Sequence, residues 1–214
     1  MLIALDRQHV GKPGRHIDDL GAWGDLDNSG DNSDVLENEA IWTGLYLFYC
    51  EIELRRMGHS VYPMSHGRYS ERHKAANRAG CDVYIAAHLN SLTGGTRSGQ
   101  TANYGAVFYD GRSSMENGPA LAEAIGAQLV ELPALRSRVR IWPAKPTDWT
   151  SRAYSTIRGV GKPVAICYEP AFMDFEAHQR AFFQSAESVA VLGQALARGI
   201  LASTQAREVN RGTV

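Results

Sequence analysis

Six short runs rich in β-branched and aromatic residues alternate along this chain with segments of helical periodicity. The candidate strands are Leu2–Asp6, His59–Pro63, Asp82–Ala87, Tyr104–Tyr109, Val139–Trp142 and Pro163–Tyr168. Strands that alternate with helices are typical of a parallel sheet covered on both faces. The pattern therefore predicts an α/β protein with a mostly parallel, twisted sheet of about six strands, flanked by helices on both faces.

Four segments carry the helical pattern. Glu39–Met57 repeats apolar residues at helical spacing, and Gly58 follows as a stop. The other candidates are Arg72–Ala79, Pro119–Leu132 and Glu176 to about Leu201. Residues 203–214 are polar and lack periodicity, which predicts a flexible tail after one domain over residues 1–202.

Composition excludes several classes of function. The formal net charge is −1, so no basic surplus favours nucleic-acid binding. No apolar run approaches the ~20 residues that span a bilayer, so we expect no stable membrane association. The opening residues "MLIALD" show neither a basic segment nor a cleavage site, so we expect no signal peptide. We expect a monomer whose cysteines, Cys50, Cys81 and Cys167, are reduced core residues.

Residues 7–36 interrupt the pattern with a long stretch of little periodicity. Within it, "DLDNSGDNSDVLE" from Asp25 to Glu37 is close to a calcium-binding loop. The closing glutamate falls one place late, however, and no helical pattern precedes the loop. Solvated turns fit this segment better than a calcium site.

Polar residues follow three of the predicted strands where each strand ends. The first strand leads to His9, the third to His88 and the sixth to Glu169, while Glu39 opens the first helix. Ligands of parallel sheets bind beyond the carboxyl ends of the strands. Two histidines and a carboxylate, with a fourth position open, suit a catalytic zinc ion, and a further carboxylate suits a general base. A capping role for each histidine and a solvated position for each glutamate remain open at this point.

Four blocks stand in a characteristic order: "IALDRQHVGKPG", Glu39 nineteen residues before Gly58, "ANRAGCDVYIAAHLNS" and "GKPVAICYEPAF". They resemble the zinc-dependent N-acetylmuramoyl-L-alanine amidases of bacterial cell-wall hydrolases and phage endolysins. The matching family features are an Asp-x-Gly-His-Gly-Gly turn, a helix-opening glutamate, a Ser-x-His-x-Asn block and a Pro-x-Val-Leu-x-Glu-x-Gly-Phe segment. The resemblance covers about residues 2–202, and the His-x-Asn-Ser block is its most specific part.

The resemblance implies a role for each matching residue. His9, Glu39 and His88 would bind Zn²⁺, and Glu169 would be the catalytic carboxylate that activates water and protonates the leaving amine. Asn90 would hold the strand-end turn or contact the substrate. The bond cleaved would join the lactyl group of N-acetylmuramic acid to the L-alanine of the peptidoglycan stem peptide. With no signal peptide, a phage endolysin is favoured, made in the host cytoplasm and acting on the wall in the periplasm after membrane permeabilisation.

Some positions depart from the family pattern. "QHVG" replaces Gly-His-Gly-Gly, "EPAF" replaces Glu-x-Gly-Phe, and Ala86 stands where the family often has serine. These changes leave the proposed ligands intact and affect the predicted shape of the peptide groove.

Several alternatives remain open from the sequence. Glu37 competes with Glu39 as the third ligand, and on a helix the two point about 200° apart, so only one can face the metal. Asp6 either orients His9 or caps the strand. Trp23, Trp142 and Trp149 either pack or line a groove for sugar or peptide. The alternative reaction is that of a zinc peptidase or carboxypeptidase acting on stem peptides, and a wall-binding protein without activity is the third class.

Overall fold

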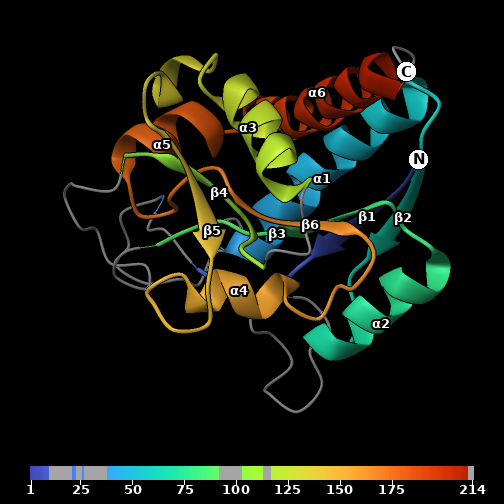
Figure 1. Cartoon of the computed structure of the whole chain (residues 1–214). Helices are drawn as coiled ribbons and strands as arrows, with labels where there is room; N and C mark the ends of the chain where they lie inside the picture. Colours follow the sequence, from blue (N-terminus) through green and yellow to red (C-terminus); the bar gives the residue numbers. More distant parts are fainter. Residues whose placement is uncertain (10–20, 23–25, 27–37, 92–102, 113–116, 212–214) are drawn as a thin grey trace.

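The structure is a computed structural model that describes residues 1–9, 21–22, 26, 38–91, 103–112 and 117–211, with the backbone alone for residues 205–211 (Figure 1). In these residues six strands form one sheet in the order β2-β1-β3-β6-β4-β5. The strands are β1 (Leu2–Arg7), β2 (Ser60–Met64), β3 (Val83–Ala87), β4 (Gly105–Asp110), β5 (Val139–Ala144) and β6 (Val164–Glu169). Strands β2, β1, β3 and β6 run parallel, β4 is antiparallel to β6, and β5 is parallel to β4. The predicted mostly parallel sheet is confirmed.

Helices cover both faces of the sheet, as the sequence predicts (Figure 1). On one face lie α1 (Glu39–Arg56), α3 (Gly118–Leu129) and α6 (Ala186–Arg211), with α6 packed against both of the others. On the other face lie α2 (Tyr69–Ala79) and α4 (Ser151–Ile157). A short helix, α5 (Glu176–Phe182), contacts α6 and the 3-10 helix η2 (Pro133–Leu135). None of the described helices is long and apolar enough to cross a membrane.

The central strands contribute alternate side chains to two cores. Ile3 of β1 and Ile85 of β3 pack in the core that includes α1, α3 and α6. Ala4 and Tyr84 point to the opposite core, which α2 and α4 complete. Because both faces are covered, these strands are apolar along most of their length, and residues suited to chemistry gather at the strand ends.

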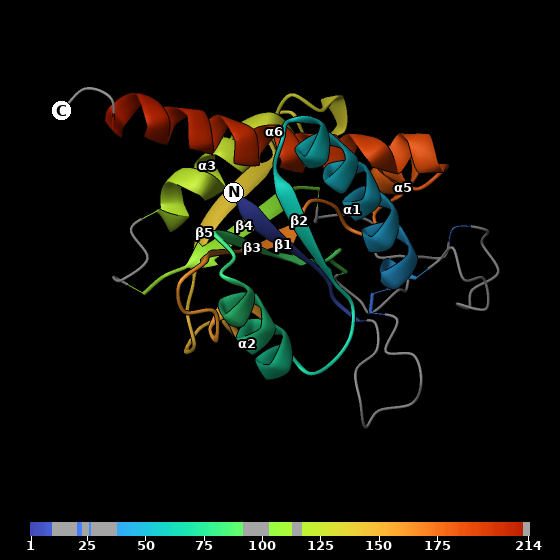
Figure 2. The ribbon, with the colours of Figure 1, turned by 90° about the vertical axis from the view of Figure 1, so that its right-hand side faces the viewer.

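The closing helix differs from its prediction in two ways. We expected one helix from Glu176 to about Leu201, but the chain forms α5 and α6 with a break between them. Ser185 causes the new start, because its hydroxyl accepts a hydrogen bond from the Ser188 amide at 3.1 Å, as an N-cap does. At its other end α6 continues to Arg211, through most of the segment expected to be a tail, and Figure 2 shows these last turns extending beyond α3.

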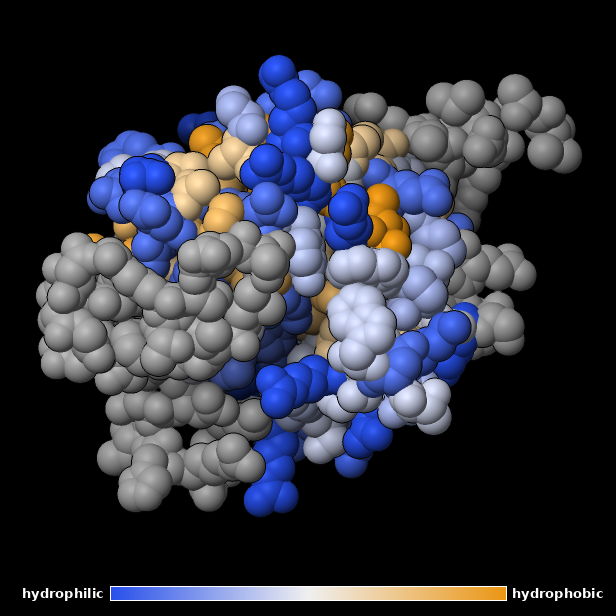
Figure 3. All heavy atoms as spheres, turned by 90° about the vertical axis from the view of Figure 1, so that its left-hand side faces the viewer, coloured by the Kyte–Doolittle hydropathy of each residue, from blue (hydrophilic) through white to orange (hydrophobic). Residues whose placement is uncertain are grey.

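The helix α4 was not predicted. It has only seven residues, too few for a periodic apolar pattern. A side-chain turn precedes it, in which the Thr150 amide donates to the Asp148 carboxylate at 2.8 Å. On the face of the molecule in Figure 3, blue hydrophilic side chains predominate among the described residues, and the orange hydrophobic ones are scattered.

Candidate functional site

The carboxyl ends of three adjacent parallel strands meet at one edge of the sheet. The strands β1, β3 and β6 are neighbours in that order. His9 lies two residues after β1, His88 follows β3 directly, and Glu169 is the last residue of β6. The three residues thus lie at a common edge of the sheet, as expected, and Glu39, the first residue of α1, lies at the same edge.

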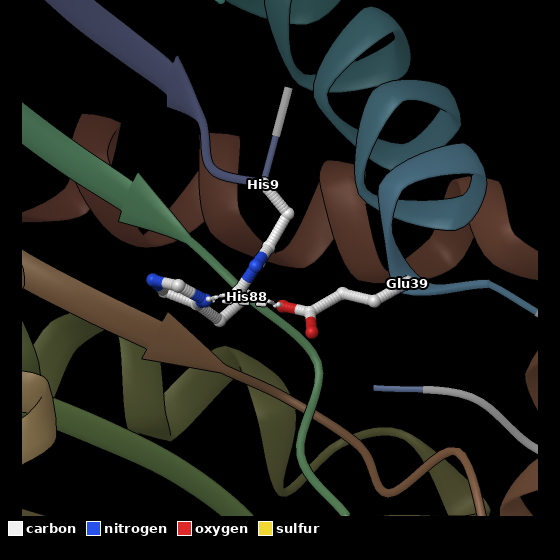
Figure 4. Close-up of side chains that lie close together, drawn as sticks. All are labelled: His9, Glu39 and His88. Carbon is white, nitrogen blue, oxygen red and sulfur yellow. Dashed lines mark hydrogen bonds and ion pairs between the residues drawn. The ribbon is translucent and has the colours of Figure 1, made fainter. Parts of the chain in front are cut away.

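The side chains of His9, Glu39 and His88 form a compact cluster (Figure 4). One ligand atom from each lies within 4.8 Å of the other two. His9 Nε2 and His88 Nδ1 are 3.1 Å apart, and Glu39 Oε1 lies 3.0 Å from His88 Nδ1 and 3.5 Å from His9 Nε2. These residues come from three separate segments of the chain, and they converge on one point.

Backbone amides fix the Glu39 carboxylate. Its Oε1 accepts a hydrogen bond from the Leu89 amide at 2.8 Å, and its Oε2 accepts one from the Ala22 amide at 2.7 Å. Gly21 makes this approach possible, since a Cβ atom there would lie 2.3 Å from Glu39 Oε2, and its φ of +82° also favours glycine. The carboxylate therefore has little freedom to rotate away from the histidines.

His88 is held through its backbone. Its amide donates to the Tyr168 carbonyl at 2.9 Å, and its carbonyl accepts the buried Tyr46 hydroxyl at 3.0 Å. The side chain is buried, so its ring is oriented by packing as well as by hydrogen bonds. The turn at the end of β3 thus directs the imidazole into the cluster.

His9 has a φ of +62°, in the left-handed region that non-glycine residues seldom adopt. Behind it, the buried Asp6 carboxylate is bound by Arg72, at 2.5 Å, and by the side chains of Gln8 and Tyr84. Of the two roles considered for Asp6, these contacts fit the structural one, because they tie the end of β1 to α2 and β3. Left-handed backbone at a non-glycine residue is typical of functional sites, where the surrounding structure maintains it.

The donor set fits a zinc ion. Ligand atoms about 2.0–2.2 Å from a tetrahedral zinc lie roughly 3.3–3.6 Å from one another. The three separations in the cluster, 3.0, 3.1 and 3.5 Å, are close to these values. Two imidazole nitrogens and one carboxylate oxygen are also the ligand types of catalytic zinc sites. Glu37, the alternative ligand, lies outside the described residues.

Glu169 stands beside the cluster. Its Oε2 accepts a hydrogen bond from Asn90 Nδ2 at 2.8 Å, and its Oε1 faces the Cys167 thiol at 3.6 Å. Burial raises the pKa of this carboxyl above its ordinary value, and the negative charge of Glu39 acts in the same direction against the opposing charge of His88. A raised pKa makes this carboxylate a better proton acceptor than an ordinary glutamate.

A cavity of about 690 Å³ connects these groups. His9, Glu39, His88, Asn90 and Glu169 all line it, so the structure brings the predicted site residues together. Arg152 of α4 also lines it, and the sequence did not single this residue out. Its helix is too short for a sequence pattern to reveal it, so no feature of the sequence could have pointed to this arginine.

Several other predictions have clear outcomes. The three cysteines are free and buried, as expected of core residues. His73 and His178 are buried, with His73 Nε2 2.7 Å from the Thr156 carbonyl oxygen. Trp23 and the possible calcium loop lie outside the described residues, apart from Leu26. Trp142 is partly buried, whereas 64% of Trp149 is exposed.

No protein-family model matches this chain, and the curated proteins give no match either. Among solved structures, the chain is similar to the N-acetylmuramoyl-L-alanine amidase AmiC2 of Nostoc punctiforme, with 19% identity, a TM-score of 0.69, and coverage of 96% of this chain and 97% of that one. It is also similar to an N-acetylmuramoyl-L-alanine amidase from Clostridium difficile 630, with 17% identity, a TM-score of 0.73, and coverage of 95% and 96%.

A third similar structure is the catalytic domain of CwlV, an N-acetylmuramoyl-L-alanine amidase from Paenibacillus polymyxa. Its identity is 18% and its TM-score 0.68, over 95% of this chain and 98% of that one. At such identities, the similarity establishes that the chain has the fold of these amidases.

Proposed function

We propose that this chain is a zinc-dependent N-acetylmuramoyl-L-alanine amidase that hydrolyses peptidoglycan. The observation that carries the proposal is the cluster of His9, Glu39 and His88 beside Glu169 in one cavity. The fold of the chain, shared with three amidases of this specificity, supports it. The resemblance of the sequence blocks around the same residues supports it independently.

In this proposal His9 Nε2, His88 Nδ1 and a Glu39 oxygen hold the metal. A zinc ion held by these residues would supply Lewis acidity, which would bring the pKa of a bound water to about 7 and polarise the scissile carbonyl. The hydrogen bonds from Leu89 and Ala22 keep Glu39 in place in the absence of metal, so the site is preorganised.

Glu169 transfers the proton that the reaction requires. Its carboxylate accepts a proton from the attacking water, and the resulting acid gives it to the nitrogen as the carbon–nitrogen bond breaks, because an amine cannot leave as its anion. Asn90 holds one oxygen of Glu169, which leaves the carboxyl with a fixed direction during both transfers. We also assign Asn90 to substrate contact, since it lines the cavity.

The test combines metal analysis with two glutamine variants. We expect Glu169→Gln to retain bound zinc and to lose activity on purified peptidoglycan by roughly 10²–10⁴-fold, the usual contribution of general acid–base catalysis. Glu176→Gln is the control, because Glu176 is largely exposed and pairs only with Arg180 among the described residues. If Glu169→Gln hydrolyses walls at the wild-type rate, the assignment of the catalytic carboxylate is wrong.

Product analysis separates this activity from the alternative, a zinc peptidase or carboxypeptidase acting on stem peptides. An amidase releases new L-alanine amino groups, produces no reducing sugar and leaves the peptide intact. Cleavage inside the peptide would favour the alternative. Action in host lysis by a phage is a further part of the proposal, and lysis of cells that depends on membrane permeabilisation would support it.

A further inference from the structure

A second, smaller cavity of about 210 Å³ adjoins the one that contains the metal cluster. The two cavities share Asn90, Arg152, Ala153 and Glu169, so the second begins at the catalytic carboxylate. Its other walls are aromatic and come from Tyr104, Phe108, Trp149 and Phe172. A substrate bound at the cluster can therefore extend past Glu169 into this aromatic recess.

Trp149 is exposed yet held in place. Its ring packs edge-on against Trp142, with centroids 4.7 Å apart at 89°, and also contacts Phe108 at 6.0 Å. The next residue is anchored by two bonds, because the Thr150 amide donates to Asp148 and the Thr150 hydroxyl accepts from the Lys145 amide, both at 2.8 Å. A large, rigid aromatic surface open to solvent is typical of a binding position, because little side-chain freedom is lost when a ligand packs on it.

Arg152 supplies the charge of this recess. Among the described lysines and arginines, Arg152 alone lines both cavities; Glu169 also lines both, and Glu39 lines the larger one. Its side chain is exposed and makes no hydrogen bond or ion pair with any residue in the part of the chain that the structure describes. The charge of Arg152 acts on Glu169 through space, but its guanidinium makes no hydrogen bond within the described residues. Its donors are therefore available to a substrate that carries a negative charge, since a planar guanidinium binds a carboxylate through two parallel hydrogen bonds.

The position of Glu169 gives the direction of the substrate. As the acid that protonates the leaving amine, it must lie beside the nitrogen of the scissile amide. The recess begins at Glu169, so the leaving-group side of the substrate, which is the peptide, is the side that reaches it. The acyl side then occupies the larger cavity.

We propose that Arg152 and Trp149 form a subsite for the peptide arm of the substrate, in which Arg152 binds a carboxylate one residue beyond the scissile bond and Trp149 packs against the peptide. This inference rests on the proposed function and adds a preference for acidic peptides. Arg152 lies in the first turn of α4 and Trp149 just before that helix, so specificity is set by a part of the fold that provides none of the three residues of the metal cluster.

The experiment compares two synthetic substrates, N-acetylmuramoyl-L-alanyl-D-glutamate and the same compound with its glutamate carboxylates amidated. We expect the wild-type chain to prefer the acid by about tenfold in kcat/KM, the usual size of a partly exposed charge-assisted contact. Arg152→Met should abolish this preference and Arg152→Glu should reverse it. Trp149→Ala should raise KM for both substrates without changing their ratio. Lys145→Met is the control, since Lys145 lies on the same segment but lines neither cavity.

The outcomes separate the two proposals. If the wild-type chain hydrolyses neither substrate and does not act on peptidoglycan, the proposed function fails. If it hydrolyses both equally, or if Arg152→Met lowers both rates by the same factor, the function stands and the subsite inference is wrong, and the recess then holds another part of the substrate, such as the sugar. The inference would also be wrong if Lys145→Met and Arg152→Met showed the same preference for the acidic over the amidated substrate.

Discussion

The buried ion pair behind His9 allows a quantitative prediction. Asp6 and Arg72 are 0% and 1% exposed, and Arg72 also donates to the carbonyls of Arg7 and Gly67 at 2.8 Å each. Arg72→Met keeps much of the aliphatic volume but removes the charge and these donors. Removing one partner of a buried pair leaves the other charge uncompensated, and we expect a loss of about 3–5 kcal/mol in the free energy of unfolding at neutral pH.

The loss should depend on pH with a definite sign. Burial raises the pKa of Asp6 above its ordinary value, and Arg72, followed by Tyr84, opposes that rise. Without Arg72 the folded-state pKa rises further, so the folded state of the variant is destabilised by the ionised carboxylate. A raised folded-state pKa means that stability is retained at low pH and lost as pH rises through that pKa. The difference between variant and wild type should therefore be largest near pH 8 and shrink as pH falls.

Urea unfolding at pH 8 and pH 5 tests this reasoning. Arg78→Met is a matched control, because Arg78 lies on the same helix and is exposed, and we expect it to change stability by less than about 0.5 kcal/mol. The double variant Asp6→Asn with Arg72→Met should recover part of the loss, since it removes the uncompensated charge. An equal loss at both pH values in Arg72→Met would refute the account, because Asp6 would then not be the source of the instability.

Three further predictions follow from single positions. Gly193→Ala should lower the free energy of unfolding by about 3 kcal/mol or more in urea titrations, because its Cβ atom would lie 1.9 Å from the Tyr46 carbonyl oxygen, where α6 packs on α1. Burial lowers the pKa of His178 to about 4, so the stability it contributes as a neutral ring should be lost as pH falls from about 6.5 toward 4. In unfolding experiments at pH 7 and pH 4.5, His178→Gln should reduce that pH dependence by roughly 2 kcal/mol. Gly21→Ala should weaken zinc binding about tenfold or more in competition with a chelator, because the added methyl group would displace Glu39.

The sequence predicts the sheet well because a strand that is buried on both faces appears in the sequence as a short, nearly continuous apolar run. Each of the six strands lies within a residue or two of its predicted range. The site edge follows from the same fact, since polar residues that end apolar runs are conspicuous, and His88 and Glu169 are found in this way. The antiparallel direction of β4 could not be predicted. A strand that is buried on both faces shows the same apolar run whether it lies parallel or antiparallel to its neighbour.

The parts of the structure that the sequence does not predict depend on single side chains, on a very short helix or on contacts between residues distant in the chain. The break before α6 depends on the hydroxyl of Ser185, whose neighbours read as a continuous helix. Arg152 and Trp149 reach the site through α4 and the turn before it, and seven helical residues give no period. The partner of Asp6 is Arg72, distant in the chain, so no local pattern could identify it.

Asn90 joins the proposed metal cluster to the proposed catalytic carboxylate. Its backbone bonds to the segment after β6, with its amide donating to the Ala171 carbonyl at 2.9 Å and its carbonyl accepting the Met173 amide at 2.8 Å. Its side chain holds Glu169. The chain leaving β3, which carries His88, is therefore fastened to the chain leaving β6, so the histidine and the glutamate cannot move independently. The proposed reaction requires the water-activating carboxylate and the metal ligands at fixed separation, so in that proposal this single asparagine acts as a positioning residue whatever contact it makes with the substrate.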